Sequence, residues 1–211
     1  MIQIFLNGGP VMWPLLILSI VALATVIERI VFLAREAMLR DPKAVATIFF
    51  EVEQGDFEKA QAAGARSRDY VARVLTQALV HRDVSFSNAL LHASSLELQR
   101  FNRGIAILDT SVTLAPLLGL LGTVTGMIRA FGLLHGSELG APTAITGGIA
   151  QALIATAFGL AIAIVSLIPF NILNSSLEQA RSEIENSAAH LEMLLTRAEK
   201  AHAQLEDIPV P

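Results

Sequence analysis

Residues 114–128, LAPLLGLLGTVTGMI, and residues 147–169, GGIAQALIATAFGLAIAIVSLIP, decide the fold of this chain. Both stretches lie in uncharged runs of the length that a membrane-spanning helix needs, which is about 20 residues. Both are also rich in glycine, alanine and threonine, where a span that faces lipid on all sides would carry leucine and isoleucine. We therefore predict two transmembrane helices that pack closely against other helices.

The small residues of each stretch share one face of a helix. In the first stretch this face carries Ala115, Gly119, Gly122 and Gly126, with Thr123 at its border. In the second it carries Gly148, Ala152, Ala155, Thr156, Gly159, Ala163 and Ser166. Helix association in lipid depends on van der Waals contact, so such faces allow two backbones to approach closely.

The composition of the whole chain also indicates a membrane protein. Of the 211 residues 53% are hydrophobic and only 16% are charged, and no charge occurs in residues 1–27, 110–128 or 139–177. Three spans follow, and the fold class is an all-α membrane protein. The chain has no cysteine, which excludes disulfides and thiolate chemistry.

The positions of the charges predict the topology. The first span, preceded by a turn at residues 7–10, is retained rather than cleaved as a signal peptide, because no cation precedes it and Glu28 and Arg29 follow it. Ten of the 15 lysine and arginine residues lie in residues 34–104, which places that segment in the cytoplasm. It reads as a helical insertion, punctuated at residues 54–56 and at Gly64, with its last helix running on into the second span.

The resulting organisation has six segments. Residues 1–33 hold the N-terminal segment and first span, 34–104 the cytoplasmic insertion, and 105–129 the second span. Residues 130–146 form a periplasmic loop, 147–170 the third span, and 171–211 a long cytoplasmic helix and a tail. Glu28 has two interpretations, an ion pair with Arg29 at the membrane interface or a carboxylate in a proton path, and its position near the cytoplasmic end favours the first.

A heptad repeat of apolar residues follows the third span. Its members are Leu177, Ile184, Leu191, Ala198 and Leu205, with Ala180, Leu194 and Ala201 at intermediate positions. This seam is suited either to a coiled coil between subunits or to packing against the insertion, and its alanine content favours internal packing.

Catalytic and cofactor-binding patterns are missing from the sequence. It contains no nucleophile elbow, no HExxH, no GxGxxG and no basic tract, so we expect no catalytic residue, no metal site, no cofactor and no nucleic-acid partner. Three spans also lack the internal repeat that is typical of secondary transporters, although an oligomer could supply further helices.

Uncharged polar side chains remain within the second and third spans: Thr110, Thr113, Thr123, Thr125, Gln151, Thr156 and Ser166. Each hydroxyl either bonds back to its own helix or lines a narrow aqueous lumen between subunits. Thr123 and Thr156, each beside a small-residue face, are the best candidates for a lumen.

This combination of motifs resembles the MotA/TolQ/ExbB proton channel family, and its ExbB branch most. The matching residues are Pro10 and Trp13-Pro14, the exit of the first span at Glu28-Arg29, APLLGLLGTVTGMI at 115–128 and GGIAQALIATAFGLAIAI at 147–164. The order of three spans, cytoplasmic insertion and terminal helix agrees over nearly the whole chain.

The resemblance implies a stator-like proton-channel subunit in the bacterial inner membrane, with a periplasmic N-terminus and a cytoplasmic C-terminus. Such subunits form a homo-oligomer, a pentamer in ExbB-like complexes, around the single transmembrane helices of an ExbD-like partner whose aspartate carries the proton. The proton motive force then drives TonB-dependent transport at the outer membrane through a TonB-like protein.

The resemblance also implies an ion pathway of Thr123, Thr156 and Gln151. The two threonines match the pore-facing threonines of the family, whereas Gln151 stands where ExbB and TolQ generally carry glutamate. Glutamine cannot take up a proton, so water, threonine hydroxyls and the partner's aspartate must relay it, or the protein conducts another ion or conducts poorly. A TolQ-like role in envelope integrity and a non-conducting scaffold are the alternative functions.

Overall fold

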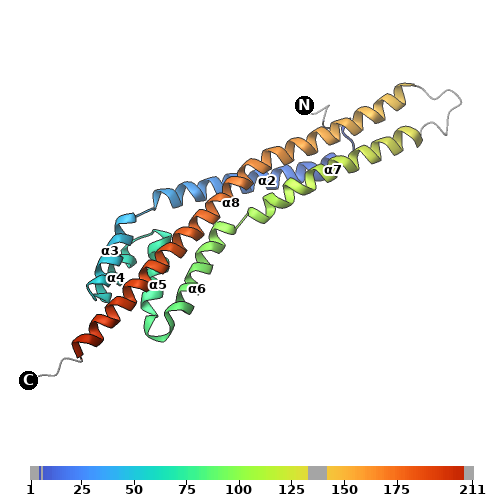
Figure 1. Ribbon diagram of the computed structural model, residues 1–211. Helices are drawn as coiled ribbons and strands as arrows, with labels where there is room; N and C mark the ends of the chain where they lie inside the picture. Colours follow the sequence, from blue (N-terminus) through green and yellow to red (C-terminus); the bar gives the residue numbers. More distant parts are fainter. Residues whose placement is uncertain (1–4, 6, 133–141, 207–211) are drawn as a thin grey trace, which may run out of the picture. The chain divides into compact units, whose positions relative to one another are not determined.

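A computed structural model describes residues 5, 7–132 and 142–206, and within these ranges every regular element is an α-helix. The helices are α2 (Met12–Met38), α3 (Pro42–Glu53), α4 (Phe57–Arg66), α5 (Tyr70–Val80), α6 (Arg82–Asn102), α7 (Ile105–Gly132) and α8 (Pro142–Glu206) (Figure 1). The all-α prediction is confirmed for these ranges. Most of the predicted periplasmic loop and the end of the predicted tail lie outside the described residues.

Three helical segments are long and apolar enough to cross a membrane, as predicted. They lie within Met12–Met38, Val84–Gly132 and Thr146–Ala198. The chain divides into two compact units, each of which combines segments that are distant in sequence. The membrane unit is Met1–Ile30 with Gly104–Asn174, and the bundle unit is Val31–Arg103 with Ser175–Pro211.

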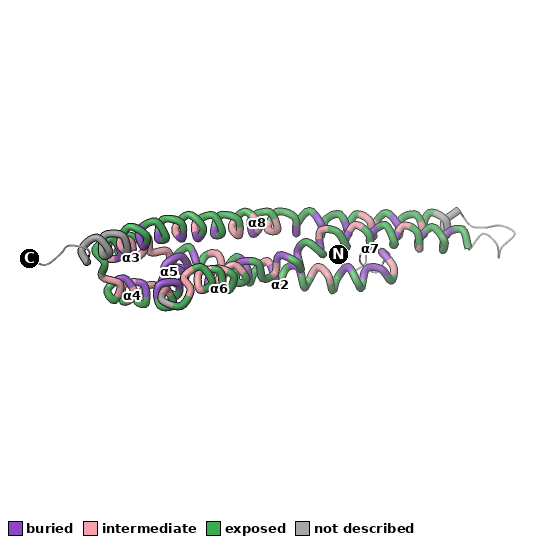
Figure 2. Tube along the Cα trace, turned by 60° about the horizontal axis from the view of Figure 1, so that its bottom comes forward, coloured by how far each residue is buried: buried purple, intermediate pink, exposed green. Residues whose placement is uncertain are grey.

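Within the membrane unit, α7 and the first half of α8 run side by side (Figure 1). Buried and exposed positions are interspersed along both helices (Figure 2). The start of α2 packs on α8 through Val11, Met12 and Leu15, which are buried in one cluster with the alanines of α7 and α8. The large apolar side chains of the opposite faces are exposed, as lipid-facing residues would be: Leu117, Leu121, Val124, Ile128, Leu153, Leu160 and Ile164.

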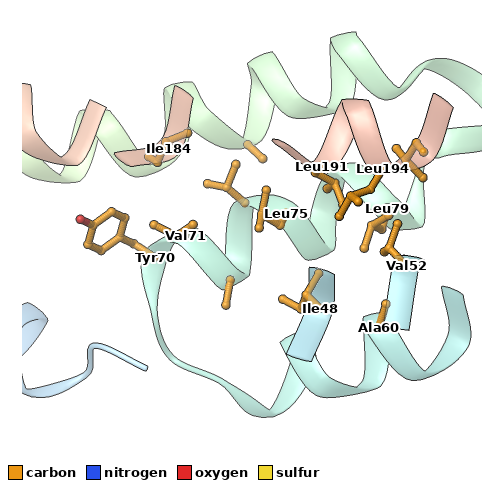
Figure 3. Close-up of a cluster of buried hydrophobic side chains, with 14 of the residues drawn as sticks. Ile48, Val52, Ala60, Tyr70, Val71, Leu75, Leu79, Ile184, Leu191 and Leu194 are labelled. Carbon is orange, nitrogen blue, oxygen red and sulfur yellow. The ribbon is translucent and has the colours of Figure 1, made fainter. Parts of the chain in front are cut away.

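The bundle unit has its own apolar core, formed by α3, α4, α5, α6 and the C-terminal part of α8. In this core Ile184, Leu191 and Leu194 of α8 face Leu75 and Leu79 of α5 (Figure 3). The heptad seam is therefore used for internal packing, which confirms the favoured interpretation of its described side chains. The side chains of Ala201 and Leu205 lie outside the described residues.

Aspartate caps begin three helices of the bundle unit. Asp41, Asp56 and Asp69 are the N-caps of α3, α4 and α5, and each side chain accepts hydrogen bonds from backbone N–H groups of the first turn. Such caps satisfy donors that a helix leaves without partners. Gly55, with φ of 78°, makes the turn between α3 and α4 that the sequence predicted at residues 54–56.

Two predictions about the helical insertion were wrong. The last helix of the insertion does not run on into the second span. Helix α6 ends at Asn102, and α7 begins only after Arg103 and Gly104, where Gly104 has φ of 82°. Gly64 is no helix break either. It lies inside α4, and a β-carbon there would overlap the hydroxyl of Thr76, so the glycine allows α4 and α5 to approach closely.

The predicted third span and the predicted cytoplasmic helix form one element, α8. α8 continues through Pro169 without a break, although the proline ring removes one backbone donor.

Candidate functional site

The candidate site is the contact between α7 and α8, where the two backbones approach across glycine and alanine. A β-carbon added at Gly159 would lie 2.5 Å from the carbonyl oxygen of Ala115, and one at Gly122 would overlap the β-carbon of Ala155. Nothing larger than hydrogen therefore fits at either glycine. We call this contact the small-residue seam.

The seam continues toward the C-terminal end of α7. A β-carbon at Gly126 would lie 3.0 Å from that of Ala152, and one at Gly148 would lie 2.6 Å from that of Ala130. The structure thus places the predicted packing residues in the seam: Ala115, Gly119, Gly122 and Gly126 on α7, and Gly148, Ala152, Gly159 and Ala163 on α8. The sequence reasoning missed Ala130, which continues the α7 stripe four residues beyond Gly126.

Thr156 connects the two helices by a hydrogen bond. Its Oγ1 donates to the backbone carbonyl oxygen of Gly119 at 3.1 Å, and the side chain is half-buried. The missing side chain of Gly119 makes this bond possible, because a β-carbon there would lie 3.0 Å from the α-carbon of Thr156. The hydroxyl keeps acceptor capacity for a further donor such as water.

Thr123 bonds to its own helix instead. Its Oγ1 donates to the carbonyl oxygen of Leu120 at 2.6 Å. The residue lies on the wall of a shallow hollow of about 570 Å³, whose other lining residues are Val124, Met127, Ile128, Phe131 and Gly132. Thr123 is therefore the one side chain with a hydroxyl in an otherwise apolar hollow on α7.

Gln151 lies on a different face of α8 from the seam. It begins a stripe that continues with Ile154 and Phe158, and these two residues pack against the start of α2. A β-carbon at Gly9 would overlap the side-chain amide nitrogen of Gln151. The structure therefore brings Gln151 to the turn before α2.

The other hydroxyl-bearing side chains of α7 form hydrogen bonds within that helix. Thr110, Ser111, Thr113 and Thr125 each donate to a carbonyl oxygen three or four residues earlier in α7. Such bonds satisfy the hydroxyl within one helix. Ser166 is buried on α8. Among the described residues no group of histidine, aspartate and glutamate side chains is arranged to hold a metal ion.

Glu28 and Arg29, near the end of the segment Met1–Ile30, form an ion pair with each other. Arg29 donates to the carboxylate of Glu28, and Arg29 is 4% exposed while Glu28 is 57% exposed. The aliphatic stem of Arg29 lies over Gly104, whose β-carbon would come 3.2 Å from Cδ of the arginine. The ion pair that the sequence predicted is confirmed.

Comparison with known proteins identifies the kind of protein that carries this seam. Residues 66–186, more than half of the chain, match the MotA/TolQ/ExbB proton channel family. The chain belongs to this family. The matched region contains all of α7 and the part of α8 that forms the seam, together with α5 and α6 of the bundle unit.

Relatives within the family align over different lengths. ExbB-like 1 of Synechocystis sp. is 38% identical over 197 residues, which are 90% of this chain and 77% of the relative. ExbB-like 3 of the same organism is 32% identical over 199 residues, 90% of this chain and 92% of the relative. TolQ of Haemophilus influenzae is 31% identical over 105 residues, 50% of this chain and 46% of the relative.

Family membership and the three apolar helices together establish a multi-pass membrane protein of ExbB/TolQ type. Its seam and threonines lie in the part of the chain that matches the family.

Proposed function

We propose that this protein is the proton-channel subunit of a motor in the bacterial inner membrane, driven by the proton motive force. Several copies, five in the arrangement that we propose, surround the transmembrane helices of an ExbD-like single-span partner. The complex passes its work to a TonB-like protein and so energises transport across the outer membrane. The N-terminus is periplasmic and the C-terminus cytoplasmic.

The observation that carries the proposal is the Thr156–Gly119 hydrogen bond in a chain of the proton channel family. The bond ties a hydroxyl to the backbone of a second helix at membrane depth. A hydroxyl can donate to this carbonyl while it accepts from a water molecule, so Thr156 presents an oriented acceptor without holding an ion tightly.

In this proposal the threonines orient water and the partner's carboxylate carries the proton. One charge that moves through 100 mV releases about 2.3 kcal/mol, which is sufficient to bias a conformational step in every cycle. Thr123, on the wall of the α7 hollow, supplies a second hydroxyl where a partner helix would lie.

Proton uptake into liposomes tests the proposal. The protein is co-purified with its single-span partner, reconstituted, and exposed to an imposed potential. We expect partner-dependent uptake that falls in Thr156→Val and persists in Thr125→Val, because the Thr125 hydroxyl bonds within α7 and Thr125 is not among the residues that line the α7 hollow. Uptake that is the same with and without the partner would overturn the proposal.

Two other functions have a specific motive. The similarity to TolQ of Haemophilus influenzae favours a TolQ-like role in envelope integrity. In that case the protein, expressed with its partner, restores envelope integrity in a strain that lacks its Tol system. It does not restore transport in a strain that lacks its TonB system. A non-conducting scaffold is motivated by Gln151, an amide that cannot take up a proton. An intact complex without uptake, and still without it after Gln151→Glu, would favour the scaffold.

A further inference from the structure

The turn of residues 7–10, which precedes α2, is built on α8. Gly9 has φ of 78°, a conformation that glycine adopts readily and other residues adopt rarely. Its carbonyl oxygen accepts from the backbone N–H of Met12 at 3.1 Å, which starts the first turn of α2. Gly8 is buried, and a β-carbon there would lie 3.2 Å from Cγ2 of Ile154.

Gln151 covers the α-carbon of Gly9. A β-carbon at Gly9 would overlap Nε2 of Gln151 and lie 2.7 Å from its Cδ and 3.2 Å from its Cγ. The amide and the end of its stem thus occupy the space that any other residue at position 9 would fill. The contact is van der Waals packing against an α-carbon, which offers neither a donor nor an acceptor.

The neighbours of Gln151 along its stripe have the same orientation. Ile154 and Phe158 follow at helical spacing and pack on the cluster that contains Val11, Met12 and Leu15. The seam residues Ala152 and Ala155 instead face α7. Gln151 therefore belongs to the contact between α8 and the start of α2.

We propose that Gln151 is a positioning residue that fastens the turn of residues 7–10 to α8 by packing on Gly9, and that it does not handle the ion. The inference deepens the proposed function, on which it rests for the meaning of ion flux. The threonines are then the ion-handling groups of this chain, and Gln151 holds the start of α2 in position on α8.

A spin label on the turn reports whether the turn is fastened. Because the chain contains no cysteine, Asn7→Cys provides its unique attachment site, and Asn7 is exposed. The labelled protein is studied in its reconstituted complex with the partner. We expect Gln151→Ala to shorten the rotational correlation time of the label, because the side chain over Gly9 is lost. Leu153→Ala is the matched control, since Leu153 lies two residues away and is 65% exposed, and it leaves the label unchanged.

A methionine variant separates packing from ion handling. Methionine has nearly the length of glutamine but no amide, so we expect Gln151→Met to keep the label slow and to retain proton uptake. A slow label with loss of uptake in Gln151→Met would overturn the proposal, because the amide itself would then be needed for the ion. A mobile label in Gln151→Met, or an unchanged label in Gln151→Ala, would overturn it as well.

Gly9→Ala tests the other side of the contact. It introduces a β-carbon where the amide lies, and we expect it to release the label as Gln151→Ala does. Alanine at position 9 also strains the backbone, because Gly9 has φ of 78°. The contact can be lost only once, so the effect of the double variant on the label should be smaller than the sum of the two single effects. If the parent complex shows no partner-dependent uptake, the proposed function fails, while the label still decides whether Gln151 fastens the turn.

Discussion

Thr156 and Gly119, 37 residues apart in sequence, are joined by a 3.1 Å hydrogen bond from the threonine hydroxyl to the glycine carbonyl oxygen. Hydrogen bonds between transmembrane helices contribute on average about 0.6 kcal/mol and at most about 1.7 kcal/mol. We expect Thr156→Val to lower the free energy of unfolding by an amount in this range, measured by denaturation in mixed detergent micelles. Thr125→Val should cost less, because its hydroxyl bonds only to its own helix. Equal losses in the two variants would contradict the interhelical bond.

A substitution at the tightest point of the small-residue seam should lower the free energy of unfolding more than Thr156→Val does. In Gly159→Ala the new β-carbon would meet two backbone atoms, the carbonyl oxygen of Ala115 at 2.5 Å and the α-carbon of Gly119 at 3.1 Å. Backbone cannot rotate away as a side chain can, so the helices must separate, at a cost of about 1–3 kcal/mol. The same unfolding measurement checks this value.

Gly147→Ala is the matched control for that variant. A β-carbon at Gly147 would have no neighbour within 4 Å. Alanine is favoured over glycine in a helix by up to about 1 kcal/mol, so this variant should be neutral or stabilising. If both variants lowered the free energy of unfolding by a similar amount, close packing in the seam would not be the cause.

Tyr70 predicts a dependence of stability on pH. Burial raises the pKa of the Tyr70 phenol, and the hydrogen bond that it donates to Glu183 raises it further. An unfolded tyrosine releases its proton near pH 10, at about its ordinary pKa. The phenol's contribution to stability is therefore fully present below about pH 10 and is lost as the pH rises toward the higher folded pKa.

The measurement follows a single group, because Tyr70 is the only tyrosine in the chain. Its near-ultraviolet tyrosinate absorbance should appear well above pH 10 in the folded protein and near pH 10 after unfolding, by the ordinary value. Tyr70→Phe should remove the corresponding alkaline decrease in stability. A normal titration in the folded protein would contradict the buried bond.

The N-cap residue Asp69 accepts hydrogen bonds from two separate segments, so its removal should lower the stability of the protein. Its carboxylate is buried and accepts from the backbone N–H groups of Val71 at 2.7 Å and Asp41 at 2.8 Å. Asp69→Ala would lose a cap and leave the Asp41 donor without this acceptor, and we expect a loss of about 3 kcal/mol. Thermal unfolding followed by circular dichroism checks it. Asp56→Ala removes an exposed cap of α4 and should cost clearly less.

Much of the fold could be predicted because its signals are local and periodic. Long uncharged runs indicated the spans, and the apolar heptads correctly indicated internal packing of α8. Glycine was harder to interpret, because it serves two needs that look alike in sequence. Gly104 supplies a positive φ and ends a helix, whereas Gly64 supplies space for Thr76 inside one.

Contacts between distant segments could not be predicted from periodicity. A helical wheel separates Gln151 from the seam but does not say that Gly9 covers its other side. The hydrogen bond from Tyr70 to Glu183 spans 113 residues and left no local pattern. The polar groups of the spans could be found from the sequence, but their partners required the structure.

The seam between α7 and α8 also has an entropic consequence. Glycine and alanine have no side-chain rotamers to lose, so the two helices associate without the ordering cost that leucine or methionine would add. The same residues lack the branched side chains that would interlock and oppose sliding. A shift by one helical turn would move the Thr156 hydroxyl about 5.4 Å from the Gly119 carbonyl. This bond therefore favours one register, together with the fit of Ala155 against Gly122.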